Sequence, residues 1–205
     1  MQIELHKISR RFNREWIFRD IDFVFERYSA TAVLGPNGSG KSTLLQILSG
    51  QLSPSSGHIS FSLSGNPVPA ELVFKQLSLA APYLELPEEM TLSELISFHF
   101  SFKKMLPGVT PSSMTELAGL EKAAAKQIRY YSSGMKQRVK LLLSFCSDTP
   151  LLLLDEPCSN LDQHGIAWYH SLVERFGKDR TLVVCSNQEN EYSFCSAELR
   201  IQEYK

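Results

Sequence analysis

Three segments of the chain alternate apolar and polar residues with a period of two. They are Ile3 to Ile8, Ile21 to Phe25 and Ile59 to Leu63. This alternation predicts strands that bury one face and expose the other, as is typical of antiparallel sheets. We therefore expect a partly exposed antiparallel β layer near the N-terminus.

Three other segments are nearly continuous apolar runs: Thr31 to Leu34, Leu151 to Asp155 and Thr181 to Cys185. Such runs predict strands covered on both faces, as in a parallel sheet. A segment with helical character follows each run. These helical segments are Lys41 to Ser49, Gln163 to Phe176 and Gln188 to Cys195. The alternation of strands and helices predicts an α/β core with a mostly parallel sheet.

A longer segment between these core elements, Thr91 to Leu120, has apolar residues at helical spacing. Thr91 is followed three residues later by Glu94, which matches a capping box and predicts a helix start. We expect an inserted α-helical subdomain of approximately residues 83–145, which includes the second small-residue turn described below. The chain as a whole, residues 1–205, is expected to form one domain.

The insert also contains an aromatic run, Phe98, Phe100 and Phe102. One buried helix stripe does not need so many aromatic side chains. We expect them to pack in the core of the insert, and a docking surface is the alternative interpretation.

The composition is that of an ordinary globular protein, with 43% hydrophobic and 21% charged residues. The 21 lysines and arginines are balanced by 22 acidic residues, so the chain has no overall positive charge and no nucleic-acid partner is expected. The longest purely aliphatic block, Leu151 to Leu154, is far shorter than the ~20 residues of a membrane span. Any membrane role is therefore expected to depend on a partner.

A glycine-rich segment, GPNGSGKST, matches the phosphate-loop pattern Gly-x-x-x-x-Gly-Lys-Ser/Thr between a predicted strand and a predicted helix. Glycines let the backbone N–H groups approach phosphate oxygens, and the helix N-terminus favours negative charge. Lys41 is expected to reach the β and γ phosphates of ATP, and Ser42 to ligate Mg²⁺. The candidate ATP-binding residues of this loop are Gly35, Pro36, Asn37, Gly38, Ser39, Gly40, Lys41, Ser42 and Thr43.

Two carboxylates, Asp155 and Glu156, directly follow the aliphatic block and precede Pro157. Ligands of open α/β sheets bind at the carboxyl ends of the strands. Asp155 is expected to hold Mg²⁺, mostly through water, and Glu156 to accept a proton from an attacking water. Two surface carboxylates after a core strand are the alternative.

A second small-residue turn, Ser132-Ser133-Gly134, runs into a cationic helical segment in the sequence YSSGMKQR. In isolation such a turn is an ordinary helix cap. Beside the phosphate loop and the two carboxylates, however, it makes the chain resemble the nucleotide-binding subunit of an ABC (ATP-binding cassette) ATPase. The resemblance covers almost the full length, and YSSGM stands where the family has its LSGGQ signature.

The resemblance implies roles for further residues. Ser132, Ser133 and Gly134 would contact the γ-phosphate of an ATP held by a second cassette. The sequence SNLD is similar to the aspartate loop of the family, which makes Asp162 a dimer-loop residue. Phe12 stands where the family stacks an aromatic ring on adenine, with Trp16 as a nearby competitor.

The implied assembly consists of two cassettes, identical or different, that pair head to tail around two ATP molecules. Their partner would be a transmembrane permease, in which substrate choice mainly resides. The subunit would be cytoplasmic and peripheral on the cytoplasmic face of the cell membrane through that permease. The implied activity is hydrolysis of ATP to ADP and phosphate.

Two positions depart from the family pattern. The family has a glutamine after the strand that precedes the helical subdomain, but Ala81 to Tyr83 offers no side-chain amide, and Gln76 is expected inside that strand. Asn187 stands at the position of the switch histidine. Its amide can donate a hydrogen bond to the γ-phosphate but cannot change charge near neutral pH. We therefore expect slow hydrolysis that depends on Lys41, Glu156 and Asn187.

Other functions remain compatible with these motifs. One is a soluble ABC ATPase acting on ribosomes or DNA, although such proteins usually join two cassettes or carry basic patches. Another is a nucleotide-gated clamp in which hydrolysis is vestigial, and the changed glutamine and histidine positions favour it. A phosphate-loop nucleotide kinase is the weakest rival, since it needs no small-residue turn before the acidic strand.

Overall fold

The computed structural model describes residues 1–205, and the chain forms two compact units. The first unit comprises Met1–Leu79, Pro150–Glu156 and Asp179–Lys205, and the second comprises Ala80–Thr149 and Pro157–Lys178. The strands are β1 (Gln2–Phe12), β2 (Glu15–Phe25), β3 (Ala30–Leu34), β4 (Ser56–Leu63), β5 (Asn66–Pro67), β6 (Leu77–Ala80), β7 (Leu151–Asp155), β8 (Thr181–Ser186) and β9 (Ala197–Arg200). The α-helices are α1 (Lys41–Leu48), α2 (Leu92–Phe102), α3 (Pro111–Ala118), α4 (Ser133–Cys146), α5 (Gln163–Phe176) and α6 (Glu189–Tyr192).

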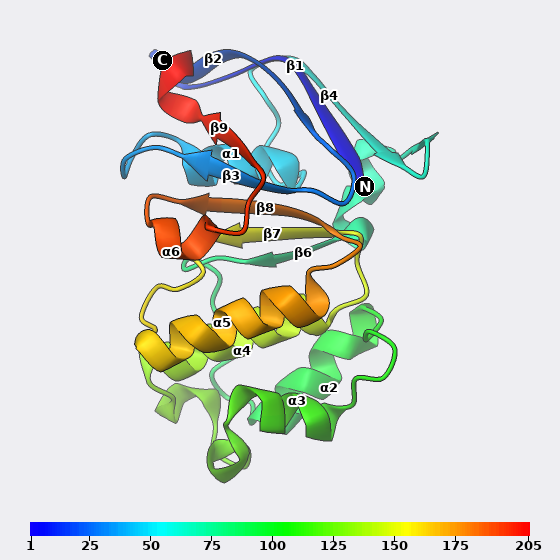
Figure 1. Cartoon of the computed structure of the whole chain (residues 1–205), viewed down its shortest axis with the longest axis vertical. Helices are drawn as coiled ribbons and strands as arrows, with labels where there is room; N and C mark the ends of the chain where they lie inside the picture. Colours follow the sequence, from blue (N-terminus) through cyan, green and yellow to red (C-terminus); the bar gives the residue numbers. More distant parts are fainter. The chain divides into compact units, whose positions relative to one another are not determined.

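A five-stranded sheet has the order β6-β7-β8-β3-β9 (Figure 1). The pairs β3 with β8, β3 with β9 and β7 with β8 are parallel. Every residue of β7 and of β8 is buried, as expected for strands covered on both faces. The predicted α/β fold with a mostly parallel sheet is confirmed.

A second sheet, with the order β2-β1-β4-β5, is antiparallel. Ile3 lies opposite Phe25 on β2 and opposite Phe61 on β4, and all three side chains are buried. The alternate residues of β1 at this end, such as Glu4, are not in the core. The prediction of a partly exposed antiparallel layer near the N-terminus is therefore confirmed.

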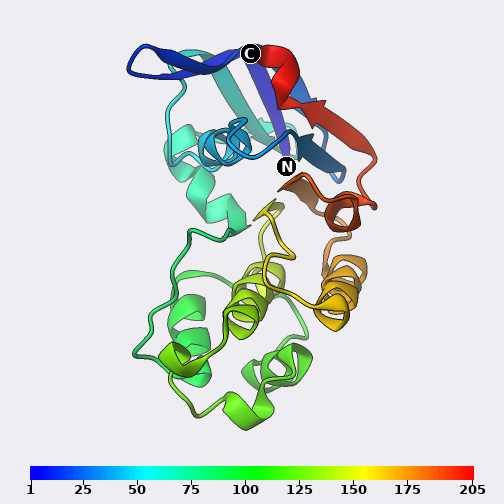
Figure 2. The ribbon, with the colours of Figure 1, turned by 90° about the vertical axis from the view of Figure 1, so that its left-hand side faces the viewer.

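One apolar core holds the first unit together. Helix α1 contacts β7 and β8, and its Leu44 and Leu45 join a cluster with Phe18 of β2 and Leu153 of β7. Figure 2 shows α1, in cyan, beside the antiparallel sheet. Each fully buried side chain of this size contributes roughly 1.5–3 kcal/mol. The phosphate loop precedes α1 directly, so this core fixes the helix end on which the loop depends.

The second unit is built from α2, α3, α4 and α5, and α4 packs against the other three helices. The predicted capping box at the start of α2 is confirmed, since the Glu94 backbone N–H donates to Thr91 Oγ1 and the Thr91 N–H donates to the Glu94 carboxylate at 2.8 Å. The indole Nε1–H of Trp168 on α5 donates to the Leu117 carbonyl at 2.6 Å. None of the helices combines the length and the apolar character needed to cross a bilayer.

The aromatic run of α2 differs from its prediction. Phe98 and Phe102 are 46% and 76% exposed, and their rings meet edge to face with centroids 5.2 Å apart. Only Phe100 packs against the core of the unit, and it is partly buried. Core packing was therefore wrong for two of the three rings. Phe98 and Phe102 lie in the second half of α2, whereas the buried residues of the helix, Leu92, Leu95 and Ile96, all lie in its first half.

Two other expectations are corrected. Gln76 is not in a strand but ends a 3₁₀ helix, Ala70–Gln76, because the chain turns after Pro69, where the Leu72 N–H donates to the Pro69 carbonyl. The helix after β8 is α6, which ends at Tyr192 instead of Cys195. It stops early because the next residues turn to join β9 to β3, and the Ser196 N–H donates to the Ala30 carbonyl at 2.9 Å.

Candidate nucleotide site

The phosphate loop of the first unit needs its glycines for steric reasons. Gly40 is the N-cap of α1 and has a φ of 109°, in the left-handed region that favours glycine. A Cβ at Gly40 would lie 2.5 Å from the Ile17 side chain, and one at Gly35 would lie 2.6 Å from Ser39 Oγ. Any larger residue would therefore displace the loop from α1 and β2.

Lys41 is enclosed by this loop and is only 5% exposed. Its ammonium donates hydrogen bonds to the Gly35 carbonyl at 2.7 Å and to the Pro36 carbonyl at 3.3 Å. These bonds hold a positive charge inside the loop, where lysine can neutralise phosphate oxygens.

Ser39 provides the test of whether the loop fits a phosphate. Its side chain is 4% exposed, and its hydroxyl has no hydrogen-bond partner. Buried polar groups in proteins nearly always have partners, so an unpartnered hydroxyl indicates a ligand atom or a stored cost. A phosphate oxygen would satisfy it, and the residues present therefore fit the phosphates of ATP.

Asp155 at the end of β7 lies beside the loop. The Ser42 hydroxyl lies near its carboxylate. Burial raises the pKa of Asp155 above its ordinary value, Glu156 adds to this rise, and the Ser42 hydroxyl and the Lys41 charge oppose it. The structure thus brings together a hydroxyl and a carboxylate oxygen, which are ligands that Mg²⁺ prefers.

Glu156 has an uncommon backbone. Its φ is 42°, in the left-handed region, and its N–H donates to the Cys185 carbonyl of β8 at 2.9 Å. This conformation costs a non-glycine residue about 1 kcal/mol or more and persists only where neighbouring structure enforces it. Such strain often occurs at functional sites, and it turns the chain sharply out of β7 at the predicted catalytic base.

Asn187, directly after β8, contacts the phosphate loop. Its side-chain Nδ2–H donates to Asn37 Oδ1 at 3.2 Å. The turn that carries Asn187 is held from behind, because the Ser186 hydroxyl donates to the buried carboxylate of Glu191 and accepts the Gln188 N–H at 2.9 Å. The structure therefore brings the residue at the switch position to the loop through a neutral amide pair.

The two candidate adenine platforms differ in how much of the ring is covered. Phe12 is 45% exposed, with the Arg10 guanidinium carbon 4.5 Å from its ring centroid. Trp16 has two guanidinium groups over it, those of Arg11 at 5.4 Å and Arg19 at 5.3 Å. Phe12 is thus the more open ring, and its stacking on adenine remains a prediction.

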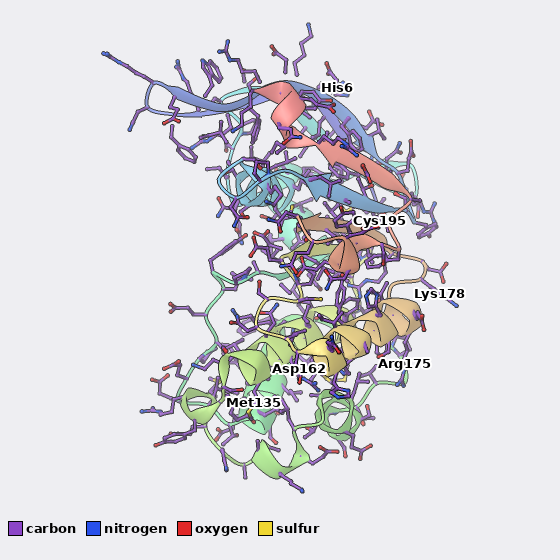
Figure 3. All side chains as sticks on the ribbon, turned by 60° about the vertical axis from the view of Figure 1, so that its left-hand side comes forward. His6, Met135, Asp162, Arg175, Lys178 and Cys195 are labelled. Atoms are coloured by element: carbon purple, nitrogen blue, oxygen red, sulfur yellow. The ribbon has the colours of Figure 1, made fainter.

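The small-residue turn lies in the second unit, at the start of α4. Ser132 is the N-cap, and its hydroxyl oxygen accepts the Met135 N–H at 3.2 Å. Ser133 and Gly134 form the first helical turn, whose N–H groups have no partner within the helix. Helix capping is therefore one role of Ser132, and the hydroxyl proton and the helix end remain suited to an anion. Met135 is labelled in Figure 3.

Asp162 has a similar local role in the second unit. It is the N-cap of α5, and its carboxylate accepts the Gly165 N–H at 2.7 Å (labelled in Figure 3). The segment just before it contacts the small-residue turn, since a Cβ on Gly134 would lie 2.8 Å from the Asn160 carbonyl oxygen. The signature and aspartate-loop candidates are thus neighbours within this unit.

Two polar residues of α4 have contacts that the sequence did not predict. Gln137 is 2% exposed and donates to the Pro157 carbonyl at 2.8 Å. Lys140 donates to the Pro82 carbonyl at 2.9 Å and to the Ala81 carbonyl at 3.3 Å. The available signal was a glutamine at a position buried among apolar residues such as Val139 and Leu141, because a buried amide needs partners.

Comparison with known proteins gives the family. Residues 18–159, more than half of the chain, match the family described as ABC transporter. The cytochrome c biogenesis ATP-binding export protein CcmA of Xylella fastidiosa is 34% identical over 168 residues, which cover 82% of this chain and 75% of that protein. The Nod factor export ATP-binding protein I of Rhizobium johnstonii is 31% identical over 167 residues, and the match spans 80% of this chain but only 53% of that protein.

A solved structure supports the fold. A putative ABC transporter ATP-binding protein from Pyrococcus furiosus superimposes with a TM-score of 0.82 at 20% identity, and the match covers 100% of both chains. At this identity the likeness shows the fold alone, and that fold is the one predicted from the motifs. The resemblance inferred from the sequence is therefore confirmed: the chain belongs to the ABC transporter family and is one of its ATP-binding ATPase subunits.

Proposed function

We propose that the chain binds and hydrolyses ATP as the energy-coupling subunit of a membrane transporter, closing with a second cassette to drive a permease. One observation carries this proposal. The Ser42 hydroxyl lies near the Asp155 carboxylate, Lys41 is held in the loop beside that carboxylate, and the buried Ser39 hydroxyl has no partner. Phosphate donors and metal-type ligands therefore occur together in the first unit.

The loop residues are assigned to the triphosphate. Lys41 would neutralise the β and γ phosphates, and the Ser39 hydroxyl and the loop N–H groups would donate hydrogen bonds to phosphate oxygens. Phe12 would stack on the adenine through its exposed face. The remaining residues of the loop, from Gly35 to Thr43, shape the backbone around the phosphates.

Ser42 and Asp155 would hold Mg²⁺, which when bound neutralises charge on the phosphate oxygens. The Glu156 carboxylate would orient the attacking water and accept its proton. The Asn187 amide would donate to the γ-phosphate with the N–H that Asn37 does not use. Because Asn187 cannot take up a proton, it would position the phosphate without contributing charge, and we therefore expect hydrolysis to be slow.

Pairing with a second cassette completes the proposed site. Ser132, Ser133 and Gly134 would contact the γ-phosphate held by the partner, with Asp162 at the interface between cassettes. The partner is a second copy or a related chain. Two relatives with export in their names, the cytochrome c biogenesis and Nod factor proteins, support a transport role. The chain would then lie at the cytoplasmic face of the membrane, bound to its permease.

The test uses Glu156→Gln in the purified chain. We expect steady-state ATP turnover to fall by at least about a hundredfold, as for loss of a general base, while ATP with Mg²⁺ converts the variant into a stable dimer. Glu174→Gln, the same change at an exposed site on α5, is the matched control and should keep its turnover. Unchanged turnover in Glu156→Gln would remove Glu156 as the base.

A nucleotide-gated clamp with vestigial hydrolysis is the second candidate. The observation that favours it is the hydrogen bond between Asn187 and Asn37, which engages the switch position with the loop in place of a titratable imidazole. A clamp would dimerise with ATP in the unmutated protein and release phosphate no faster than Glu156→Gln. Recovery of the tagged chain from membranes with a spanning protein would support the transporter, and recovery only with ribosomes or DNA would contradict it.

A further inference from the structure

Two crossings between the units lie at the carboxyl ends of strands of the mostly parallel sheet. The first unit ends at Leu79 and again at Glu156, so the second unit resumes at Ala80 and at Pro157. Strand β6 ends at Ala80, and Glu156 follows the last residue of β7. The chain segments just after these two points are therefore connected directly, through the backbone, to the ends of β6 and β7. Side chains that hydrogen-bond to these segments are linked to those strand ends in the same way.

Gln137 of α4 hydrogen-bonds to the chain segment that follows β7. Its Nε2–H donates to the Pro157 carbonyl at 2.8 Å, and the bond is buried. Pro157 immediately follows the predicted catalytic base, Glu156. A buried amide that lost this acceptor would be left without a partner, so the bond constrains the distance between α4 and Pro157 strongly.

Lys140 of α4 hydrogen-bonds to the chain segment that follows β6. Its ammonium donates to both the Ala81 and the Pro82 carbonyl oxygens. This is the segment where the resemblance leads one to expect a glutamine side chain and the sequence has none. Gln137 and Lys140 are three residues apart and so lie on the same face of the helix. One helix thus donates to both chain segments.

Helix α4 also carries the small-residue turn at its N-terminus. It is continuous from Ser133 to Cys146, so its first turn moves with the turns that carry Gln137 and Lys140. The close approach of Gly134 to the Asn160 carbonyl adds a third fixed point. We propose that Gln137 and Lys140 are positioning residues that transmit displacements at Pro157 and at Ala81–Pro82 to Ser132, Ser133 and Gly134.

This inference rests on the proposed function, because it assumes that the small-residue turn completes the ATP site of a partner. Two hydrogen-bond donors on α4 would couple the nucleotide site to that turn. They would replace the glutamine side chain that the family has at the position of Ala81 to Tyr83. Both side chains donate to backbone carbonyl oxygens, so each hydrogen bond depends on the position of the main chain and not on a particular side chain. A defect in the link would impair pairing and leave nucleotide binding to the first unit intact.

The experiment uses the purified full chain carrying Glu156→Gln, with Gln137→Met or Lys140→Met added. Methionine keeps an unbranched apolar stem and removes the donor. Calorimetry should give ATP affinities within about twofold of the parent, whereas ATP-dependent dimerisation should weaken by about tenfold or more, as expected for a lost buried or charged hydrogen bond. With Glu156 intact, kcat should fall and KM should stay nearly constant.

Matched variants separate positioning from general damage. Lys136→Met removes the same charge from α4, but Lys136 bonds the exposed carboxylate of Glu88, so dimerisation should change by less than about threefold. Lys140→Arg keeps a cation that can donate to two carbonyls and should restore most of the pairing.

Each outcome has one interpretation. Unchanged dimerisation in both methionine variants, or a parallel loss of ATP affinity, would overturn the inference. If a variant unfolds, hydrogen exchange of the Glu156→Gln parent provides the test instead. On ATP addition, the exchange rates of the amides near Met135 and near Pro157 should change together. Independent changes in the two sets of rates would contradict the link. Failure of the proposed function is distinct, because the Glu156→Gln parent itself would then stay monomeric with ATP.

Discussion

The carbonyl oxygen of Asn160 occupies the space that a side chain at Gly134 would need, since a Cβ there would lie only 2.8 Å away. Asn160 itself has a φ of 64°, a conformation that asparagine tolerates better than most residues. The first turn of α4 and the segment before α5 are therefore packed backbone to backbone. This contact joins two motifs that the sequence separates by more than 20 residues.

Gly134→Ala tests that contact. Alanine favours a helix interior over glycine by about 1 kcal/mol, yet its methyl group must push the Asn160 carbonyl away. We expect ATP turnover to fall by about tenfold or more and the thermal midpoint not to rise. The same-helix control Lys136→Ala, at an exposed ion pair, should change neither quantity appreciably. Turnover equal to that of the parent would show that the close approach has no functional weight.

Glu156 should be a site where stability and activity conflict. Its φ of 42° strains any residue with a Cβ, so Glu156→Gly should raise the free energy of unfolding by about 1 kcal/mol. Glu156→Ala keeps a Cβ and should gain nothing. Both changes should abolish turnover. Urea unfolding of the two variants gives the comparison, and equal stabilities would argue against backbone strain at this position.

The unpartnered hydroxyl of Ser39 leads to a third prediction. Ser39→Ala removes a buried polar group that has no partner, so stability should stay constant or rise by about 1 kcal/mol. ATP affinity should fall by about tenfold if the hydroxyl donates to a phosphate. Ser49 is buried to the same extent, but its hydroxyl donates to the Gln46 carbonyl at 2.9 Å. Ser49→Ala should show the reverse pattern, with lower stability and unchanged affinity.

His99 on α2 predicts a pH dependence of stability. Burial, aided by the nearby Lys103 charge, lowers its pKa from 6.5 to about 4, and its Nε2 lies 2.9 Å from Ser147 Oγ. The unfolded chain therefore binds a proton more readily than the folded one. The stability from neutral His99 is present in full above pH 6.5 and is lost as the pH falls toward 4.

Urea unfolding at a series of pH values between 7 and 4.5 checks this sign. His99→Gln cannot titrate but can still hydrogen-bond, so the part of the slope that His99 causes should disappear in that variant. A slope that is identical in the two proteins would assign the pH dependence to other groups.

Patterns with strong periodicity predicted the fold well. The period-two segments became β1, β2 and β4, and the apolar runs became β3, β7 and β8. The loop from Gly35 to Thr43 was recognisable in the sequence because the phosphate-loop pattern fixes both residue type and spacing. The contacts of Gln137 and Lys140 could not be predicted from a sequence pattern, because their acceptors are backbone carbonyls, which every residue has. The exposure of Phe102 was missed because periodicity predicts the helix but not how far along the helix the core extends.

The placement of the two tryptophans has a practical consequence. Trp16 belongs to the first unit, beneath two guanidinium groups, and Trp168 belongs to the second, where its indole N–H is hydrogen-bonded to Leu117. Each unit thus carries its own intrinsic fluorophore. With excitation selective for tryptophan, a Trp16→Phe protein would emit only from the second unit and a Trp168→Phe protein only from the first, so the response of either unit to ATP could be followed without an added dye.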